Sequence, residues 1–431
     1  MMIRLPRGPI ALGTLRTSMV LGLRLLVQAG TLLLVARMLG PEEFGAFAGI
    51  AALAMLVGTL ATFGTHLVLL AGISKDRTQR KQILSYALPT TLLCGVVLLS
   101  VFLLICELML QTERVGWNVL LAIGVAEIFL IPMLGLVVAE FLAAENTARA
   151  QMLQILPLIL RLMVALVVVG GELGEPLSIY AYGYCVVAAI ALFAAINCMP
   201  RPWPHFAYWR WPTGQELYES ASYAVLNVTA IGPSEFDKAL AARLLPLPVA
   251  GLYAAAARVV GAVSLPVIAL MLSALPRLFR DGGNGTYRSA RLLWWIFWAT
   301  VLYGTGLAFI LWWGASSFVW LFGDVYHGVD EVIRWLCFAV PGMALRIAAG
   351  NVLMAVGKPW MRAGFEIAGV VVLAVAAFLY TSDHGAKGMS LALVCSEWVM
   401  ALIGSWLVVS VHKKNGSQSF SMPVDVKKTS R

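Results

Sequence analysis

Charged residues are scarce in this chain. Only 12% of its 431 residues are Asp, Glu, Lys or Arg, whereas 60% are hydrophobic. Soluble globular proteins carry roughly 25% charged residues, so the sequence lacks the polar surface that would keep a globule of this size in water. Apolar runs of about 20 residues recur along the chain, and each is long enough to cross a hydrocarbon layer of roughly 30 Å. The composition excludes a soluble enzyme and predicts a membrane protein.

Motifs for metal binding, nucleotide binding and covalent catalysis are also lacking. The six cysteines lie in or beside apolar segments without a CxxC pair, and the five histidines are dispersed. No P-loop, GxSxG, HExxH or GxGxxG stands in a suitable context. The net charge of +9 comes from short loops and the two ends rather than from a basic stripe, which argues against nucleic acid. We therefore expect no cofactor, no metal and no enzymatic activity.

The apolar segments predict an all-α polytopic membrane protein with about twelve transmembrane helices. The predicted spans are 17–38, 44–71, 83–110, 118–142, 152–170 and 179–198 in the first half, and 217–242, 249–276, 291–314, 332–355, 363–381 and 388–411 in the second. The longest internal loop holds Trp203, Trp209 and Trp211, which are expected to anchor it at the membrane interface. The predicted domains are an N-terminal lobe (1–200), a cytoplasmic linker (201–216), a C-terminal lobe (217–411) and a basic cytoplasmic tail (412–431).

The distribution of lysine and arginine predicts the orientation. With the N-terminus in the cytoplasm, 21 of the 31 basic residues fall on the cytoplasmic side and five on the other, and the remainder lie inside spans. Loops that stay in the cytoplasm carry an excess of Lys and Arg. The sequence therefore predicts a multi-pass protein of a bacterial inner membrane with both termini in the cytoplasm.

An internal repeat relates the two halves. LLVARMLGPEEFGAFAGIAA (33–52) aligns with ALAARLLPLPVAGLYAAAAR (239–258) at an offset of 206 residues, with seven identities in twenty positions. Gly45 matches Gly251, Arg37 matches Arg243, and Phe47 faces Tyr253. Each copy joins the first and second span of its half, so the repeat is parallel. Parallel repeats predict two six-helix lobes related by a pseudo-two-fold axis along the membrane normal.

The same segments carry a family resemblance. ARMLGPEEFGAFAGI near the N-terminus resembles Wzx-type polysaccharide flippases of the multidrug/oligosaccharidyl-lipid/polysaccharide exporter superfamily. The segment EFDKALAARLLPLPVAGLYAAAARVVGAVSLPVIALMLSALPRLFR (235–280) is similar to their seventh and eighth helices. WLFGDVYHGVDEVIRWL (320–336) and GKPWMR (357–362) resemble later links of the same family. The resemblance covers nearly the whole chain.

This resemblance implies a function. The family moves undecaprenyl-pyrophosphate-linked oligosaccharides from the cytoplasmic to the periplasmic leaflet, for O-antigen, capsule or exopolysaccharide synthesis. It implies membrane lipid and a lipid-linked glycan as partners, proton or sodium ions as candidates for coupling, and polysaccharide polymerase or export proteins as candidate protein partners. Alternating access of the two lobes is the implied mechanism.

Charges inside the predicted spans are the candidate functional residues, because each costs several kcal/mol unless it is paired or hydrated. Arginine matches phosphate oxygens, so the predicted cationic substrate cavity contains Arg24, Lys238, Arg258 and Arg346. The candidates for ion coupling or pairing are Asp237, Glu366, Glu397 and Glu127. The competing interpretation is packing by helix-to-helix ion pairs, namely Glu127–Arg161, Arg346–Glu397, and Arg258 with Asp237 or Glu235. Arg37 and Arg243, at span ends, are expected to cap helix carbonyls.

Two other functions remain open from the sequence. An ion-coupled multidrug extruder of the same superfamily would favour acidic residues in the first lobe, which offers Glu127 and Glu140 but also Arg24 and Arg161. A membrane-embedded polysaccharide polymerase or ligase would need a large outer loop with catalytic residues, and the longest predicted outer loop (315–331) is short and offers few polar candidates.

Overall fold

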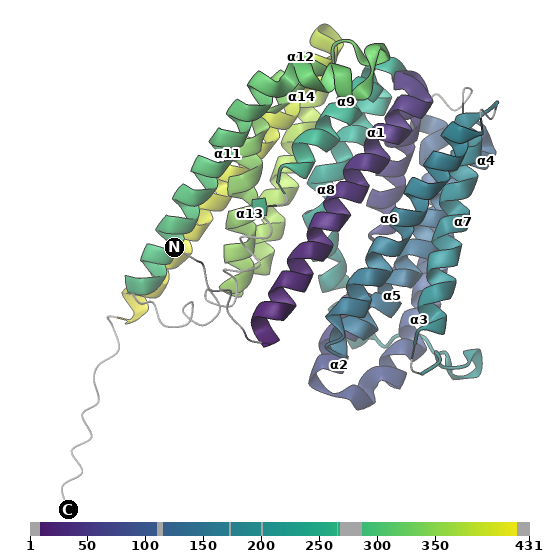
Figure 1. Ribbon diagram of the computed structural model, residues 1–431. Helices are drawn as coiled ribbons and strands as arrows, with labels where there is room; N and C mark the ends of the chain where they lie inside the picture. The colour runs from purple at the N-terminus through teal and green to yellow at the C-terminus, as the bar shows by residue number, and fades with distance from the viewer. Residues whose placement is uncertain are drawn as a thin grey trace, which may run out of the picture. The chain divides into compact units, whose positions relative to one another are not determined.

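The computed structural model describes residues 9–109, 115–171, 174–199, 201–264, 266–267 and 287–419. Within these ranges every regular element is helical and no strand is present, which confirms the all-α fold (Figure 1). Residues 1–8, the last part of the predicted tail (420–431) and much of predicted span 249–276 lie outside the described residues.

The helices follow one another with short connections. They are α1 (Pro9–Gly58), α2 (Thr65–Lys75), α3 (Arg80–Met109), α4 (Trp117–Gly124), the π-helix η3 (Val125–Leu130), α5 (Ile131–Ala143), α6 (Thr147–Gly170), α7 (Pro176–Asn197), α8 (Gly214–Leu244), α9 (Leu247–Ala262), α11 (Tyr287–Phe322), α12 (Val329–Leu336), α13 (Ala339–Ala355) and α14 (Pro359–Ser419). Short 3₁₀ turns are η1 (Arg77–Gln79), η4 (Phe206–Tyr208) and η5 (Asp324–Tyr326).

Two of these helices each contain two predicted spans. α1 is broken at Gly40, where φ is 68° and ψ is 173°, directly before Pro41. α14 is broken at Gly385, where φ is 55° and ψ is −132°. Only glycine adopts such angles without a steric penalty, so both breaks fall where the sequence predicts the end of one span and the start of the next.

The helix lengths agree with a multi-pass membrane protein. Seven helices in the described part are long and apolar enough to cross a membrane, and α12 with α13, bent by 46°, form an eighth candidate. Dividing α1 and α14 at their glycines adds two more. The short apolar helix α9 and the charge-bearing α8 bring the count to the predicted twelve.

One predicted span is not a single helix. The sequence predicts a continuous span over 44–71, but α1 ends at Gly58 and α2 begins at Thr65. Phe63 and Gly64 between them have positive φ angles of 47° and 76°. The prediction was wrong here because hydropathy registers the apolar character of 59–64 but not its threonine- and glycine-rich backbone, which turns.

The described helices pack into two compact units. The first comprises residues 1–259 and 316–330, and the second comprises 260–315 and 331–431. The first unit thus includes α8 and most of α9, which the sequence analysis assigns to the C-terminal lobe. These units reflect packing in this conformation, whereas the predicted lobes follow the sequence repeat. The lobe boundary at residue 217 stays a prediction.

Apolar side chains fill the interior of each unit and also cover much of its outside. In the first unit, one core cluster joins α2, α3 and α5, and another joins α5, α6 and α7. In the second unit, Leu353, Phe365 and Met400 join α13 and α14. α3 exposes Leu93, Val96, Val97, Leu104 and Leu108, each between 49% and 65%. Such a continuous apolar exterior requires lipid rather than water around it.

Candidate functional site

A buried ion pair with two tyrosines lies within the first unit. Arg161 of α6 donates from Nη2 to Glu127 Oε1 at 2.9 Å, which confirms the predicted pairing. The Tyr184 hydroxyl of α7 donates to the same carboxylate oxygen, and the Arg161 guanidinium lies 3.5 Å from the centre of the Tyr184 ring. Tyr180 packs edge-on against Tyr184, with ring centroids 6.2 Å apart. The negative charge of Glu127 is therefore compensated inside the membrane.

Two backbone irregularities adjoin this ion pair. Glu127 lies on the π-helix η3, and π-bulges recur at functional sites. The end of α1 packs on it, because a Cβ added to Gly58 would lie 2.3 Å from the Glu127 carbonyl oxygen. In the following turn, the Asn227 amide of α8 donates to the Thr59 carbonyl at 3.2 Å. Non-helical backbone at membrane depth must be satisfied by neighbouring helices. Sequence reasoning missed this contact, because Asn227 and Thr59 are 168 residues apart and share no motif.

A second cluster of charges lies on α8. Lys238 donates to Asp237 Oδ1 at 3.1 Å and to the Ser234 carbonyl oxygen, and its Nζ lies 3.8 Å from Glu235 Oε2. The Tyr253 hydroxyl of α9 donates to Asp237 Oδ2 at 3.0 Å. Asp237 and Lys238 are both buried. Lys238, predicted to line the substrate cavity, is thus held by two carboxylates.

The predicted pairing of Arg258 with Asp237 or Glu235 is wrong. Asp237 is already occupied by the neighbouring Lys238 and by Tyr253. Arg258, on α9, is partly buried and has no hydrogen bond or ion pair with any described residue. Its charge lies within electrostatic range of Tyr180.

Arg24, like Arg258, lacks a partner among the described residues. It lies on the first half of α1, and its side chain is partly buried. Across the described ranges, neither a hydrogen bond nor an ion pair engages it. Arg24 and Arg258 both belong to the first compact unit.

The remaining candidates form a network in the second unit. Arg346 of α13 donates from Nε to Glu397 Oε2 at 2.7 Å, and its Nη1 lies 3.9 Å from Glu366 Oε1. Arg362 donates from Nε to Glu366 Oε1 at 3.0 Å. Two guanidinium groups thus balance two carboxylates on α13 and α14. This geometry supports the packing interpretation of Arg346. It also gives Glu366, a predicted coupling or pairing candidate, its partners Arg346 and Arg362.

Arg37 caps a helix, as its place in the repeat predicts. It donates from Nε to the Leu321 carbonyl at 2.9 Å and from Nη2 to the Trp320 carbonyl at 3.1 Å. These carbonyls belong to the last turn of α11 and have no partner within that helix. Nearby, the buried Tyr326 hydroxyl donates to the Ala36 carbonyl at 2.8 Å. The matching Arg243 is exposed in the last turn of α8.

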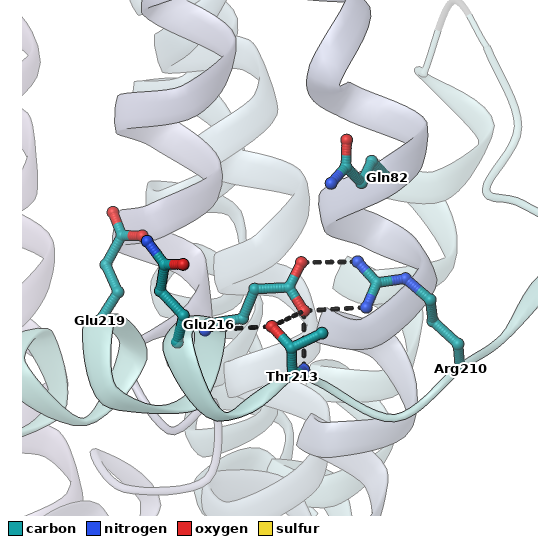
Figure 2. A pocket seen from close by; sticks show the side chains of 6 residues that line it. Gln82, Arg210, Thr213, Glu216 and Glu219 are labelled. Atoms are coloured by element: carbon teal, nitrogen blue, oxygen red, sulfur yellow. Dashed lines mark hydrogen bonds and ion pairs between the residues drawn. The ribbon is translucent and has the colours of Figure 1, made fainter.

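The connection between α7 and α8 is fixed to the first unit rather than loose. Glu140 of α5 accepts from Arg80 Nε and, at 3.0 Å, from Trp203 Nε1. Arg80 also donates to the Arg201 carbonyl at 3.0 Å. Trp203 packs against two core clusters, whereas Trp211 is 66% exposed. The role of these tryptophans as interfacial anchors stays a prediction. A polar pocket lies beside this connection, lined by Gln82, Arg210, Thr213, Gln215, Glu216 and Glu219 (Figure 2).

Solved structures of membrane transporters share this fold. An inward-facing multidrug resistance MATE family transporter of the MOP superfamily aligns with a TM-score of 0.74 and 13% identity, over 92% of this chain and 96% of its own. The lipid II flippase MurJ in an inward closed conformation aligns with a TM-score of 0.72 and 12% identity, over 94% of this chain and 90% of its own. A MOP superfamily transporter from Pyrococcus furiosus aligns with a TM-score of 0.65 and 12% identity, over 93% and 95%. These likenesses confirm the predicted twelve-helix, two-lobe fold.

The amino-acid sequence identifies the family. No curated protein matches the chain significantly. The family model described as polysaccharide biosynthesis protein matches residues 10–280, which is more than half of the chain. This range contains both copies of the repeat, Arg24, the Glu127–Arg161 pair and the charges of α8 and α9. The family resemblance read from the sequence is therefore confirmed, and the chain belongs to the polysaccharide biosynthesis protein family.

Proposed function

We propose that this protein is a flippase that moves an undecaprenyl-pyrophosphate-linked oligosaccharide from the cytoplasmic to the periplasmic leaflet of a bacterial inner membrane. The observation that carries the proposal is the pair of arginines, Arg24 and Arg258, that have no ion-pair partner among the described residues. The family match to polysaccharide biosynthesis supports a glycan-bearing substrate.

The charge balance inside the predicted spans explains why these two arginines matter. Arg161, Lys238 and Arg346 each contact a carboxylate within 3.1 Å, so their charges are compensated. Arg24 and Arg258 add two positive charges that no carboxylate among the described residues balances. A buried charge persists in a membrane protein where a ligand or water compensates it. A pyrophosphate diester carries about two negative charges and offers oxygens that accept bidentate arginine hydrogen bonds.

The proposed cycle is alternating access. The pyrophosphate and the first sugars bind from the cytoplasmic side, the two lobes rock, and the glycan is released on the other side, while the polyprenyl chain remains in lipid. Outward movement of two negative charges is favoured by the membrane potential, by roughly 4–5 kcal/mol at 100 mV if the arginines do not move with the anion.

The predicted coupling residues hold other cations in this conformation. Glu127 binds Arg161, Asp237 binds Lys238, and Glu397 binds Arg346. Glu366 contacts both Arg346 and Arg362. In the proposed cycle these carboxylates position helices that carry or flank the free arginines. Coupling to protons or sodium ions stays a prediction.

The test is transport in liposomes. The purified protein is reconstituted with a fluorescent undecaprenyl-pyrophosphate oligosaccharide, and an impermeant quencher reports movement between leaflets. We expect wild type to equilibrate the leaflets and Arg24→Ala and Arg258→Ala to be at least tenfold slower. Arg243→Ala is the matched control, because Arg243 is an exposed arginine at the end of α8, and it should transport at the wild-type rate.

Two results would contradict the proposal in different ways. If wild type transports and both arginine variants match it, the protein is a flippase but the cationic site is wrong. If glycan lipids stay in one leaflet while an organic cation crosses down a proton or sodium gradient, the substrate class is wrong and the protein is a multidrug extruder.

A further inference from the structure

The polar pocket beside the α7–α8 connection lies apart from the charges inside the spans. It has a volume of about 600 Å³ and is open to solvent. Its wall comes from three segments of the first unit: Gln82 at the start of α3, Arg210 and Thr213 before α8, and Gln215, Glu216 and Glu219 in the first turns of α8 (Figure 2). By the predicted orientation this pocket faces the cytoplasm.

A capping box and an ion pair hold part of the pocket wall in place. Thr213 and Glu216 form a capping box at the start of α8. Arg210 donates from Nη1 and Nη2 to the two Glu216 carboxylate oxygens at 2.8 and 2.6 Å. The Arg210 backbone also donates to the Ser85 carbonyl at 3.0 Å, which ties the connection to α3. A pre-formed wall avoids the entropy cost of ordering a loop when a ligand binds.

Three other lining side chains present polar groups to the pocket. The side chains of Gln82, Gln215 and Glu219 make no hydrogen bond or ion pair with any residue in the described part of the chain, and all three are exposed. Together they offer two amides, each both a donor and an acceptor, and one carboxylate acceptor. These groups are the type that pairs with the neighbouring hydroxyls of a sugar, each of which donates and accepts.

The charge of the lining narrows the ligand class. One arginine and two glutamates give a net charge of −1, and Arg210 is already engaged by Glu216. This balance disfavours a phosphate or other anion. No group of three or more His, Cys, Asp or Glu side chains in the described ranges could hold a metal ion. A neutral molecule rich in hydroxyl groups fits best.

We propose that this pocket binds a sugar residue of a glycan, with Gln82, Gln215 and Glu219 hydrogen-bonded to its hydroxyls. If the proposed function holds, the sugar belongs to the lipid-linked oligosaccharide, which the pocket captures before translocation. Binding of the sugar itself does not depend on that function.

Saturation-transfer NMR tests the binding. The full-length protein in nanodiscs is mixed with methyl glycosides of glucose, galactose, mannose, rhamnose, glucuronic acid and N-acetylglucosamine. We expect signal transfer to at least one glycoside, with about tenfold weaker binding in Gln215→Ala and Glu219→Gln, because each removes one of the few polar contacts. Glu145→Gln, at an exposed glutamate in the turn before α6, is the matched control and should bind normally.

Three results would overturn the proposal. Wild type could bind none of the six glycosides, the pocket variants could bind as wild type does, or Glu219→Gln could abolish binding of tetraphenylphosphonium while no glycoside binds. The last result would assign the pocket to an organic cation.

A transport assay distinguishes this proposal from the flippase proposal. Two fluorescent lipids are compared in liposomes: bare undecaprenyl pyrophosphate and its glycan-bearing form. We expect Glu219→Gln to slow only the glycan-bearing lipid and Arg24→Ala to slow both. Equal slowing of both lipids by Glu219→Gln would contradict the pocket's role in glycan capture. If wild type moves neither lipid, the flippase proposal fails, and the glycoside titration alone decides whether the pocket binds sugar.

Discussion

Gly45 and Gly251 pack backbone against backbone, although 206 residues separate them. A Cβ added to Gly45 would lie 2.8 Å from the Gly251 nitrogen, and one added to Gly251 would lie 1.9 Å from the Pro41 carbonyl oxygen. The two glycines occupy matched positions of the sequence repeat. Equivalent atoms of a two-fold pair that touch each other must lie beside the axis. The contact therefore marks where the pseudo-two-fold axis of the repeat passes between α1 and α9.

Gly251→Ala should destabilise this contact strongly. The added methyl group has no room against the Pro41 carbonyl, and overpacking a well-packed interior typically costs about 1–3 kcal/mol of unfolding free energy. Denaturation of the purified protein in detergent measures the loss. Gly261→Ala on the same helix is the control, because nothing lies within 4 Å of its added Cβ, and alanine there should be neutral or slightly stabilising. Equal stability of the two variants would show that the helices separate at no cost.

The repeat is symmetric in backbone and asymmetric in charge. Tyr253 of the second copy donates to the buried Asp237 at 3.0 Å. Its counterpart Phe47 packs instead on Tyr180, with ring centroids 5.3 Å apart. Arg258 has Ala52 as its counterpart. At these two positions the first copy supplies apolar side chains where the second supplies a hydroxyl group and a charge, so a ligand drawn to Arg258 meets no matching arginine at position 52.

Tyr253→Phe converts the second copy to the residue of the first, and should cost about 1–3 kcal/mol of unfolding free energy. The reason is that a buried carboxylate loses a hydrogen bond that water cannot replace. The measurement is denaturation in detergent, compared with Tyr208→Phe, whose side chain is 73% exposed. A Tyr253→Phe variant as stable as the Tyr208→Phe control would mean that Lys238 alone satisfies Asp237.

Replacing one partner of the Glu127–Arg161 pair should destabilise the protein more than replacing both partners with uncharged residues. Arg161→Met leaves a buried carboxylate held only by Tyr184, and loss of one partner of a buried pair costs about 3–5 kcal/mol. The double variant Glu127→Gln with Arg161→Met leaves no buried charge and should recover most of that loss. Stability of the single and double variants in detergent checks this. If the double variant is the less stable one, the pair itself contributes net stability and the prediction is wrong.

Hydropathy predicted most of the fold. The predicted spans end close to Gly40 and Gly385, where the helices break, because charged and polar residues around both glycines interrupt the apolar runs. The break over 59–64 was missed, because its stability depends on a distant donor, Asn227, that a local pattern does not reveal. The lobe boundary predicted from the repeat also differs from the boundary of the packed units. The repeat follows the order of the helices along the chain, whereas packing also depends on the conformation.

The candidate site was predictable where two charges lie at similar depth on neighbouring helices. Glu127 with Arg161 and Arg346 with Glu397 were paired correctly on that basis. The same rule failed for Arg258, because depth does not say which face of a helix a side chain takes, and Lys238 is closer to Asp237 along the chain. The pocket of Figure 2 was also missed, since it combines residues from α3 and α8 that share no motif.

The Arg210–Glu216 pair should make the α7–α8 connection sensitive to acid. The hydrogen bonds from Arg210 lower the pKa of Glu216 from 4.5 to about 2, more than its partial burial raises it. A carboxyl group whose pKa is lower in the folded state stabilises that state above its unfolded pKa, and the stabilisation is lost as the pH falls through the folded value. Wild type should therefore be more stable than Glu216→Gln above pH 4.5, with the difference shrinking between pH 4.5 and about 2. Glutamine keeps the capping box, so this comparison isolates the charge. Melting temperatures of both proteins in detergent across this range provide the measurement, and a difference that does not change with pH would show that Arg210 and Glu216 do not act as an ion pair.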